Sequence, residues 1–236
     1  MVKKILYTVL LLIIPLLINS CSAQTMINTK LAAAKKGFVQ IQVYRKACTE
    51  MVCIEGMHSV GSGALMLLKG KPYALTAAHV CEPETGDLEP DSEVEVKILL
   101  QDINGVKHQA QLVKYNRDLD LCLVSVQENT NVANRFFYFK LSSEAPTYAQ
   151  KVYNISAPLG VVDIQMLPLF EGRFFGSVKD RDMYSMPAAI GASGSPIINS
   201  KGEIVGVVLA VHRNFHHITL STRFWDIHGF FRPLYN

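Results

Sequence analysis

The 236-residue sequence predicts an all-β protein made of two packed antiparallel β-barrels. Two series of short runs are rich in β-branched residues or alternate apolar with polar residues, which is typical of strands. Clusters of turn residues separate the runs, and one longer connection divides the two series. With 49% hydrophobic and 18% charged residues, the composition is that of a globular protein, and one all-β domain commonly reaches about 200–250 residues.

The first 23 residues are expected to be an export signal and not part of the fold. Lys3 and Lys4 precede an apolar run from Ile5 to Ile18, which ends in the small and polar stretch NSCSAQ. The run is shorter than the roughly 20 residues that span a bilayer as a helix, so an uncleaved anchor is the weaker alternative.

Two processing routes remain open for this signal. The stretch INSC resembles a bacterial lipoprotein box, although Asn19 fits it imperfectly; residues 1–20 would then be removed and Cys21 lipidated. Alternatively, cleavage after CSA releases a chain that begins at Gln24. Both routes predict an exported protein of the periplasm or cell envelope, either anchored in the membrane through Cys21 or secreted. Residues 24–36 are expected to be a tether or a short helix.

Four cysteines remain when Cys21 is set aside, and an even number in an exported protein favours disulfides. Three connectivities fit. We favour Cys48 with Cys53, which closes a small loop, and Cys81 with Cys122. The alternative is four buried free thiols.

The first barrel is expected to cover about 37–127. Its six predicted strands lie at 37–44, 63–68, 73–80, 93–100, 107–115 and 119–126. The stretch INGV between the fourth and fifth is a good hairpin signal.

The second barrel is expected to cover about 140–224, within one domain of residues 37–236. Its predicted strands lie at 151–158, 164–178, 183–190, 194–200, 203–211 and 217–224. The last residues, from Phe224 on, are predicted to form a short helix and a tail.

The charge pattern excludes nucleic acid as a partner. The net charge is +3, and removal of Lys3 and Lys4 with the signal leaves 3 − 2 = +1, with no basic patch. His212, His216 and His217 have spacing that would suit a metal pair on a helix, but they follow a predicted strand, so a solvated loop is expected. No metal site and no cofactor are predicted.

Three stretches carry residues that can do chemistry. His79 follows a predicted strand and small residues in YALTAAHVC. Asp120 begins an apolar strand in NRDLDLCLVSV, where a carboxylate is costly unless it is ionised and hydrogen-bonded; Asp118, in the turn, is the alternative. The stretch GASGSP holds two serines beside Gly191 and Gly194, whose backbones adopt angles that other residues resist.

Together the three residue types point to nucleophilic catalysis. A serine hydroxyl needs a positioned base, usually His, and an Asp fixes the tautomer of that His. The stretches TAAHVC, DLDLCLV and GASGSPIIN resemble the three signatures of the trypsin-like serine proteases. Their gaps, 120 − 79 = 41 and 193 − 120 = 73 residues, are similar to those of the bacterial HtrA/Deg and glutamyl-endopeptidase branches. The resemblance covers about Gly37 to Phe224.

The resemblance implies the chymotrypsin fold, two six-stranded antiparallel β-barrels with a catalytic cleft between them. It implies that His79 is the general base and acid, that Asp120 orients it, and that Ser193 is the nucleophile. It also implies an oxyanion hole made by the main-chain N–H groups of Gly191 and Ser193. Ser195 stands where the family usually has a second Gly.

The sequence departs from the family at two places. Ala192 stands where digestive enzymes carry an Asp that pairs with a freed N-terminus, and no IVGG-like start is present, so activation by that ion pair is not expected. No PDZ module of the HtrA type is expected after Phe224.

The expected walls of the substrate pocket are apolar: Ala189, Ile190, Val207, Val208 and Leu209. Val208 falls where acid-specific relatives place a His. A small or medium-sized apolar side chain is therefore predicted on the amino side of the cleaved bond.

The predicted function is that of an exported serine endopeptidase that hydrolyses proteins or peptides through an acyl-enzyme. One alternative is a catalytically silent binding or structural protein on the same fold. A second is an esterase or a self-cleaving maturation protease, although the esterase elbow GxSxG is absent.

Overall fold

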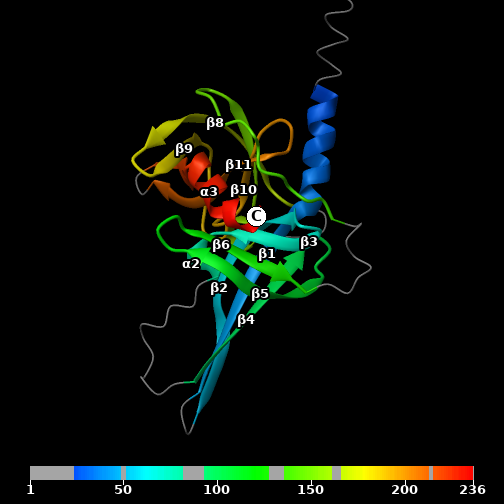
Figure 1. Cartoon of the computed structure of the whole chain (residues 1–236), viewed down its shortest axis with the longest axis vertical. Helices are drawn as coiled ribbons and strands as arrows, with labels where there is room; N and C mark the ends of the chain where they lie inside the picture. Colours follow the sequence, from blue (N-terminus) through cyan, green and yellow to red (C-terminus); the bar gives the residue numbers. More distant parts are fainter. Residues whose placement is uncertain are drawn as a thin grey trace, which may run out of the picture.

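Two closed six-stranded antiparallel β-barrels form the protein, as the sequence predicts (Figure 1). The computed structural model describes residues 24–48, 52–81, 93–127, 136–160, 166–212 and 215–235. The predicted export signal, with Cys21 and both cleavage points, lies outside these residues. No helix of the described residues is long and apolar enough to cross a membrane.

Barrel one has the strand order β1-β2-β3-β6-β5-β4. Its strands are β1 (Phe38–Cys48), β2 (Cys53–Leu68), β3 (Lys71–Thr76), β4 (Glu93–Asp102), β5 (Lys107–Asn116) and β6 (Leu121–Val126). The third strand is shorter than predicted, because the chain turns into the single-turn helix α2 (Ala78–Cys81). That turn places His79 on a helix and not on a strand.

Barrel two has the strand order β10-β11-β12-β9-β8-β7. Its strands are β7 (Lys151–Ile155), β8 (Leu169–Val178), β9 (Arg181–Ser185), β10 (Pro196–Ile198), β11 (Ile204–His212) and β12 (Phe215–Thr222). The residues before β10, from Met186 to Ser195, are turns and loops that contain the expected nucleophile.

Helices lie at both ends of the described chain. Residues 24–34 form a helix, followed by the 3-10 turn η1 (Lys35–Gly37), so this segment is the short helix and not a free tether. Leu31 and Ala34 bury one face of it in the core, which explains why the helix forms next to the barrels. The predicted terminal helix is α3 (Phe224–Tyr235), which buries Phe224, Ile227, Phe230 and Phe231.

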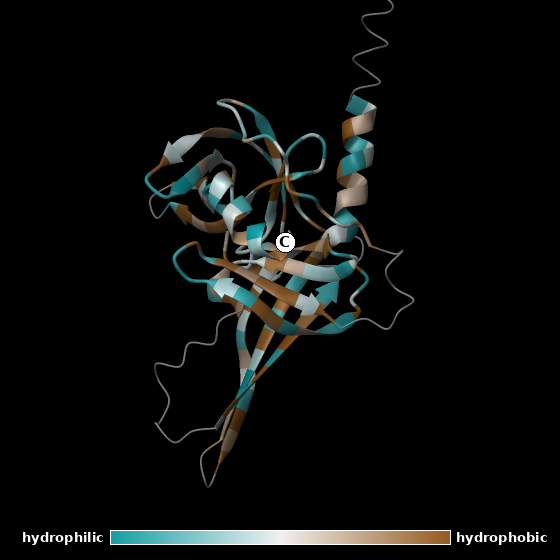
Figure 2. Ribbon diagram, in the orientation of Figure 1, coloured by the Kyte–Doolittle hydropathy of each residue, from teal (hydrophilic) through white to brown (hydrophobic). Residues whose placement is uncertain are grey.

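The sequence did not predict how far β1 and β2 extend. With the start of β4 they form a narrow arm below barrel one, paired as far as Cys48 with Cys53 (Figure 1). Apolar and polar residues mix along the arm, and Ile54 is 73% exposed (Figure 2). Because both faces of the arm meet water, the buried–exposed alternation that marks a strand is missing there.

The two barrels share one hydrophobic core. Its buried residues include Leu75, Leu121 and Leu123 from barrel one and Val207 and Leu209 from barrel two. A second, smaller cluster lies within barrel two, around Val152, Tyr184 and Val208. Because the barrels pack through a shared core, loops from each are held in fixed contact at their junction.

Both favoured disulfides are present, Cys48–Cys53 and Cys81–Cys122. The first joins β1 to β2 at the tip of the arm, and the second joins α2 to β6. Disulfides of this kind are typical of proteins from oxidising compartments, outside the cytosol.

Candidate active site

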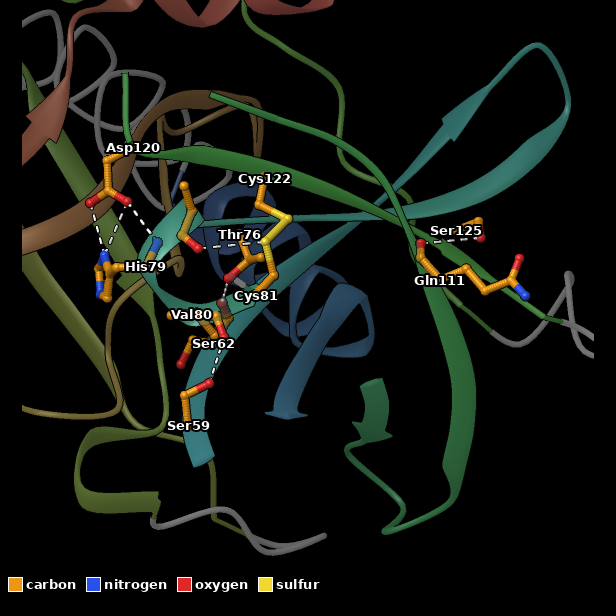
Figure 3. Close-up of a disulfide and its surroundings, with 11 residues drawn as sticks. Ser59, Ser62, Thr76, His79, Val80, Cys81, Gln111, Asp120, Cys122 and Ser125 are labelled. Carbon is orange, nitrogen blue, oxygen red and sulfur yellow. Dashed lines mark hydrogen bonds and ion pairs between the residues drawn. A yellow bond between two sulfur atoms is a disulfide. The ribbon is translucent and has the colours of Figure 1, made fainter. Parts of the chain in front are cut away.

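His79 and Asp120 form a close pair in barrel one (Figure 3). The ring Nδ1 of His79 lies 2.8 Å from Oδ2 and 3.1 Å from Oδ1 of Asp120. The backbone N–H of His79 also donates to Oδ1, at 3.0 Å. A carboxylate accepts hydrogen bonds, so it selects the tautomer with the proton on Nδ1 and leaves Nε2 as an acceptor. The His79 side chain is half-exposed, which leaves room for a substrate beside it.

Asp120 is held in place by an unusual backbone turn. Its φ is +53°, in the left-handed region, and its N–H donates to the carbonyl of Arg117. From barrel two, the Thr222 hydroxyl donates to the carbonyl of Leu119 at 2.6 Å. Asp118, the alternative, is exposed, so the turn presents Asp120 alone to His79.

The pKa of Asp120 lies below its ordinary value of 3.8. Burial acts to raise this pKa, but the hydrogen bonds from the ring and backbone of His79 lower it, as do the charges of His79 and Arg181. The carboxyl group is therefore ionised at neutral pH and is able to stabilise a cationic imidazolium.

The Cys81–Cys122 disulfide braces this pair. Cys81 lies two residues after His79, and Cys122 lies two residues after Asp120, so the bond ties together the segments that carry them (Figure 3). Cys81 and Cys122 are buried.

Replacing both Cys81 and Cys122 by alanine is expected to lower the free energy of unfolding by about 2–4 kcal/mol, because the closed loop spans 41 residues. Any catalysis that depends on His79 and Asp120 should also fall, because the two segments lose their covalent link. Denaturant unfolding and kcat measure the two effects. The matched control replaces Cys48 and Cys53 at the tip of the arm; if that pair lowers kcat as much, the brace is not specific to the site.

The loop from Ile190 to Ser195 distinguishes its two serines. Ser195 is completely buried, and its Oγ accepts a hydrogen bond from Nδ2 of Asn154 at 2.8 Å. Ser193 is partly exposed, and its hydroxyl donates to the carbonyl of Leu209 at 3.4 Å. Only Ser193 is therefore accessible to a substrate. Asn154 is itself completely buried on β7.

The loop that carries Ser193 packs directly against barrel one at Gly61. A Cβ on Gly61 would lie 2.6 Å from Cγ2 of Val80 and 2.9 Å from the carbonyl oxygen of Ser193. The helix that carries His79 and the loop that carries Ser193 therefore meet at Gly61. Gly194 has φ +84°, and a Cβ there would collide with the Thr76 hydroxyl and the Ser62 carbonyl, so only glycine fits.

The peptide groups around Gly191 have a defined orientation. The N–H of Leu159 donates to the carbonyl of Ile190 at 2.6 Å, and because a trans peptide directs C=O and N–H oppositely, the N–H of Gly191 points away from Leu159. Among the described residues, no backbone carbonyl accepts from the N–H of Gly191 or Ser193. Ala192, in place of the acidic residue of digestive enzymes, is fully buried, and its N–H donates to Ala189. Gly191 is buried and Ser193 is partly exposed, so the two N–H groups differ in their exposure.

The five expected wall residues divide into two groups. Ala189 and Ile190 are exposed, with Ile190 at 80%. Val207, Val208 and Leu209 on β11 are buried, and Val207 belongs to the shared core. β11 therefore exposes little apolar surface to solvent, whereas Ala189 and Ile190 on the loop before Gly191 are exposed.

Sequence reasoning missed three residues that support the site: Ser62, Asn154 and Leu159. Each acts through a hydrogen bond to a residue far along the chain, which no spacing rule reveals. The prediction that His212, His216 and His217 lie in a solvated loop is wrong, because His212 ends β11 and the other two lie on β12. Among the described residues, no group of three or more His, Cys, Asp or Glu could hold a metal ion.

The chain is similar in sequence to one protein family. The sequence profile of a family described as "Trypsin-like peptidase domain" matches residues 61–207, more than half of the chain. That range includes His79, Asp120 and Ser193. No curated protein matches the sequence.

Two solved structures are similar in fold. The serine endoprotease from Yersinia pestis has a TM-score of 0.65 and 18% identity, over 89% of this chain and 66% of that one. The Rv3671c protease in its inactive form has a TM-score of 0.64 and 15% identity, over 88% of this chain and 93% of that one. This chain therefore spans slightly less than two thirds of the Yersinia protease. Identities this low show a shared fold alone.

Proposed function

The chain belongs to the family of trypsin-like peptidases, and we propose that it is an exported serine endopeptidase that works through His79, Asp120 and Ser193. The observation that carries the proposal is the pair of hydrogen bonds from His79 Nδ1 to the ionised Asp120. This pairing leaves Nε2 as the free base of the site. The accessible serine on the adjoining loop is Ser193, because Ser195 is buried.

The proposed reaction has two steps. Nε2 of His79 takes the proton from the Ser193 hydroxyl as Oγ attacks the peptide carbonyl carbon, and the tetrahedral adduct then expels the amine, which receives that proton. A water molecule, deprotonated by the same His79, attacks the acyl-enzyme and releases the acid, restoring Ser193. Asp120 stays ionised throughout and stabilises the imidazolium.

The N–H groups of Gly191 and Ser193 are the proposed oxyanion hole. Donors fixed before reaction stabilise the developing charge without reorganisation, each contributing roughly 3–4 kcal/mol. The hydrogen bond from Leu159 to Ile190 supports this role, because it keeps the Gly191 N–H directed away from its own loop. The hole is then formed at rest, without the ion pair that activates digestive enzymes.

The proposed substrate is a protein or peptide with a small or medium-sized apolar residue before the cleaved bond. Val207, Val208 and Leu209 on β11 are apolar and buried, and Ile190 is apolar and exposed, which supports a small apolar side chain as the group that would bind between β11 and this loop. The proposed location is the periplasm or cell envelope, with Cys21 lipidated or the chain released at Gln24. Two disulfides support export.

A fluorophosphonate probe, which reacts with activated serines, tests the function. The protein expressed in a bacterial host with its signal should be labelled on Ser193, and peptide mass spectrometry should locate the adduct. The same spectra report the first residue, either an acylated Cys21 or a free Gln24. Labelling at Ser195 would contradict the assignment, and no labelling of well-folded protein would favour a silent binding protein on this fold.

A further inference from the structure

Ser62 lies where barrel one meets the loops of barrel two. It is on β2 and is completely buried. β3 pairs with β2 only from Ala64 onward, so the backbone of Ser62 is open on that side. The space is filled by the loop that carries Ser193, whose carbonyl accepts the Ser62 N–H at 2.8 Å.

The hydroxyl of Ser62 joins two loops of barrel two. It donates to the carbonyl of Gly191 at 2.7 Å and accepts the N–H of Ala157 at 3.2 Å. Ala157 begins the turn that contains Leu159, and Leu159 in turn donates to Ile190. One hydroxyl from barrel one therefore contacts both the loop with the proposed oxyanion donors and the turn that orients it.

Ser62 is itself held in a fixed position. The Thr76 hydroxyl donates to its carbonyl at 2.8 Å, as Figure 3 shows, and its N–H is bonded to Ser193. The backbone N–H and C=O of Ser62 are both hydrogen-bonded, and its hydroxyl both donates and accepts a hydrogen bond. Its side chain therefore has one favourable orientation. The hydroxyl is therefore a rigid support for the loop and not a mobile contact.

The contact with Gly191 fixes the peptide group between Gly191 and Ala192. Its carbonyl is bonded to Ser62 and its N–H to the carbonyl of Ala189. Glycine rotates more freely than other residues, and Gly191 has φ +91°, so without these bonds its own N–H would have several orientations. The hydrogen bond from Ser62 thus limits the backbone rotation of Gly191.

We propose that Ser62 is a positioning residue of the proposed peptidase: from barrel one it holds the oxyanion-hole loop of barrel two in the reactive geometry. The inference rests on the function proposed above. Ser62 is not proposed to contact the substrate. Its effect on the reaction is through the position of Gly191.

The test compares Ser62→Ala with the wild-type protein. We expect kcat to fall by about 10- to 100-fold while KM changes by less than about threefold, because misplaced donors weaken transition-state binding and not substrate binding. A peptide boronate, which forms a tetrahedral adduct with the serine, should bind more weakly by a similar factor. The affinity for the cleaved product peptide should stay within about twofold.

Ser142→Ala is the matched control. Ser142 is also buried, and its hydroxyl donates to the carbonyl of Glu144 at 2.8 Å and accepts from the N–H of Glu144 and Nδ2 of Asn199, none of which belongs to the proposed site. We expect this variant to lose stability but keep its kcat. The proposal is overturned if Ser62→Ala keeps kcat within twofold, if Ser142→Ala lowers kcat equally, or if the whole loss appears in KM. Should Ser62→Ala fail to fold, Ser62→Cys fills the same space with a weaker donor, and the same criteria apply.

A separate measurement distinguishes failure of this inference from failure of the proposed function. If the wild-type protein neither cleaves peptides nor labels at Ser193, the function is wrong. Amide hydrogen exchange of the segments 157–160 and 190–193 then tests, independently of catalysis, whether Ser62 holds these two loops in place. Faster exchange in Ser62→Ala supports it, and unchanged exchange overturns it.

Discussion

Replacing Ser193 by alanine is expected to lower kcat on the order of 10⁶-fold, because no acyl-enzyme can form without the nucleophile. KM should change little, since the side chain lost is one hydroxyl at the edge of the site. Labelling by the fluorophosphonate probe should disappear as well. Steady-state kinetics on a peptide substrate, with the fold checked by circular dichroism, measure the effect.

Ser195→Ala is the control that chooses between the two serines. Ser195 is buried and its hydroxyl accepts the Asn154 side chain, so its loss should lower the free energy of unfolding by about 1–3 kcal/mol. Activity should stay within about tenfold of wild type, because Ser195 has no access to substrate. If Ser195→Ala removed labelling and Ser193→Ala did not, the assignment of the nucleophile would be wrong.

Replacing Asp120 by asparagine is expected to lower kcat about 10⁴-fold while leaving the backbone in place. The carboxylate accepts Nδ1–H of His79, whereas an amide can present an NH₂ group that favours the opposite tautomer, with the proton on Nε2. Nε2 would then be unable to take the proton of Ser193. The kinetics of Asp118→Asn provide the comparison, since that exposed side chain should have no effect beyond twofold or so. Equal losses from Asp118→Asn and Asp120→Asn would contradict the pairing.

The same variant also has an expected pH signature. Because the pKa of Asp120 is lowered in the folded protein, ionisation stabilises the fold above the unfolded value of about 3.9, and this contribution is lost as the pH falls through the folded pKa. The difference in unfolding free energy between wild type and Asp120→Asn should therefore decrease as the pH falls below about 4. A difference that grew toward acid pH would show that the pKa is raised instead.

The strands could be predicted because most of them lie on the barrels. Barrel strands are rich in apolar and β-branched residues: apolar residues of β1 alternate with Gln40 and Gln42, and β6 is apolar at nearly every position. The arm could not be predicted, because its residues meet water on both faces. The turn at α2 was also missed, since four residues of helix are too few to produce a period.

The pairing of His79 with Asp120 agrees with the sequence prediction, because each residue lay in a stretch with its own local signature. The choice of Asp120 over Asp118 required the left-handed turn, which brings one carboxylate to His79 and leaves the other in water. The wall residues were predicted as one apolar set. Their division depends on tertiary packing: Val207 and Leu209 lie in the shared core and Val208 in the cluster of barrel two, whereas Ala189 and Ile190 lie on an exposed loop.

By itself the sequence determined the all-β class and the two barrels. It also favoured the two disulfide pairs, and its resemblance to the trypsin-like proteases pointed to the three residues of the proposed triad, which stay a prediction. These predictions depend on local patterns, because the residues that indicate a strand, a turn or a reactive side chain lie within a few positions of one another. The stretch GASGSP alone left two serines, and the register of the resemblance pointed to Ser193. Burial of Ser195 against Asn154, and the Ser62 bond to Gly191 across 129 positions, were decided only by the tertiary structure. A hydrogen bond between barrels depends on how the shared core orients them, and no local pattern carries that information.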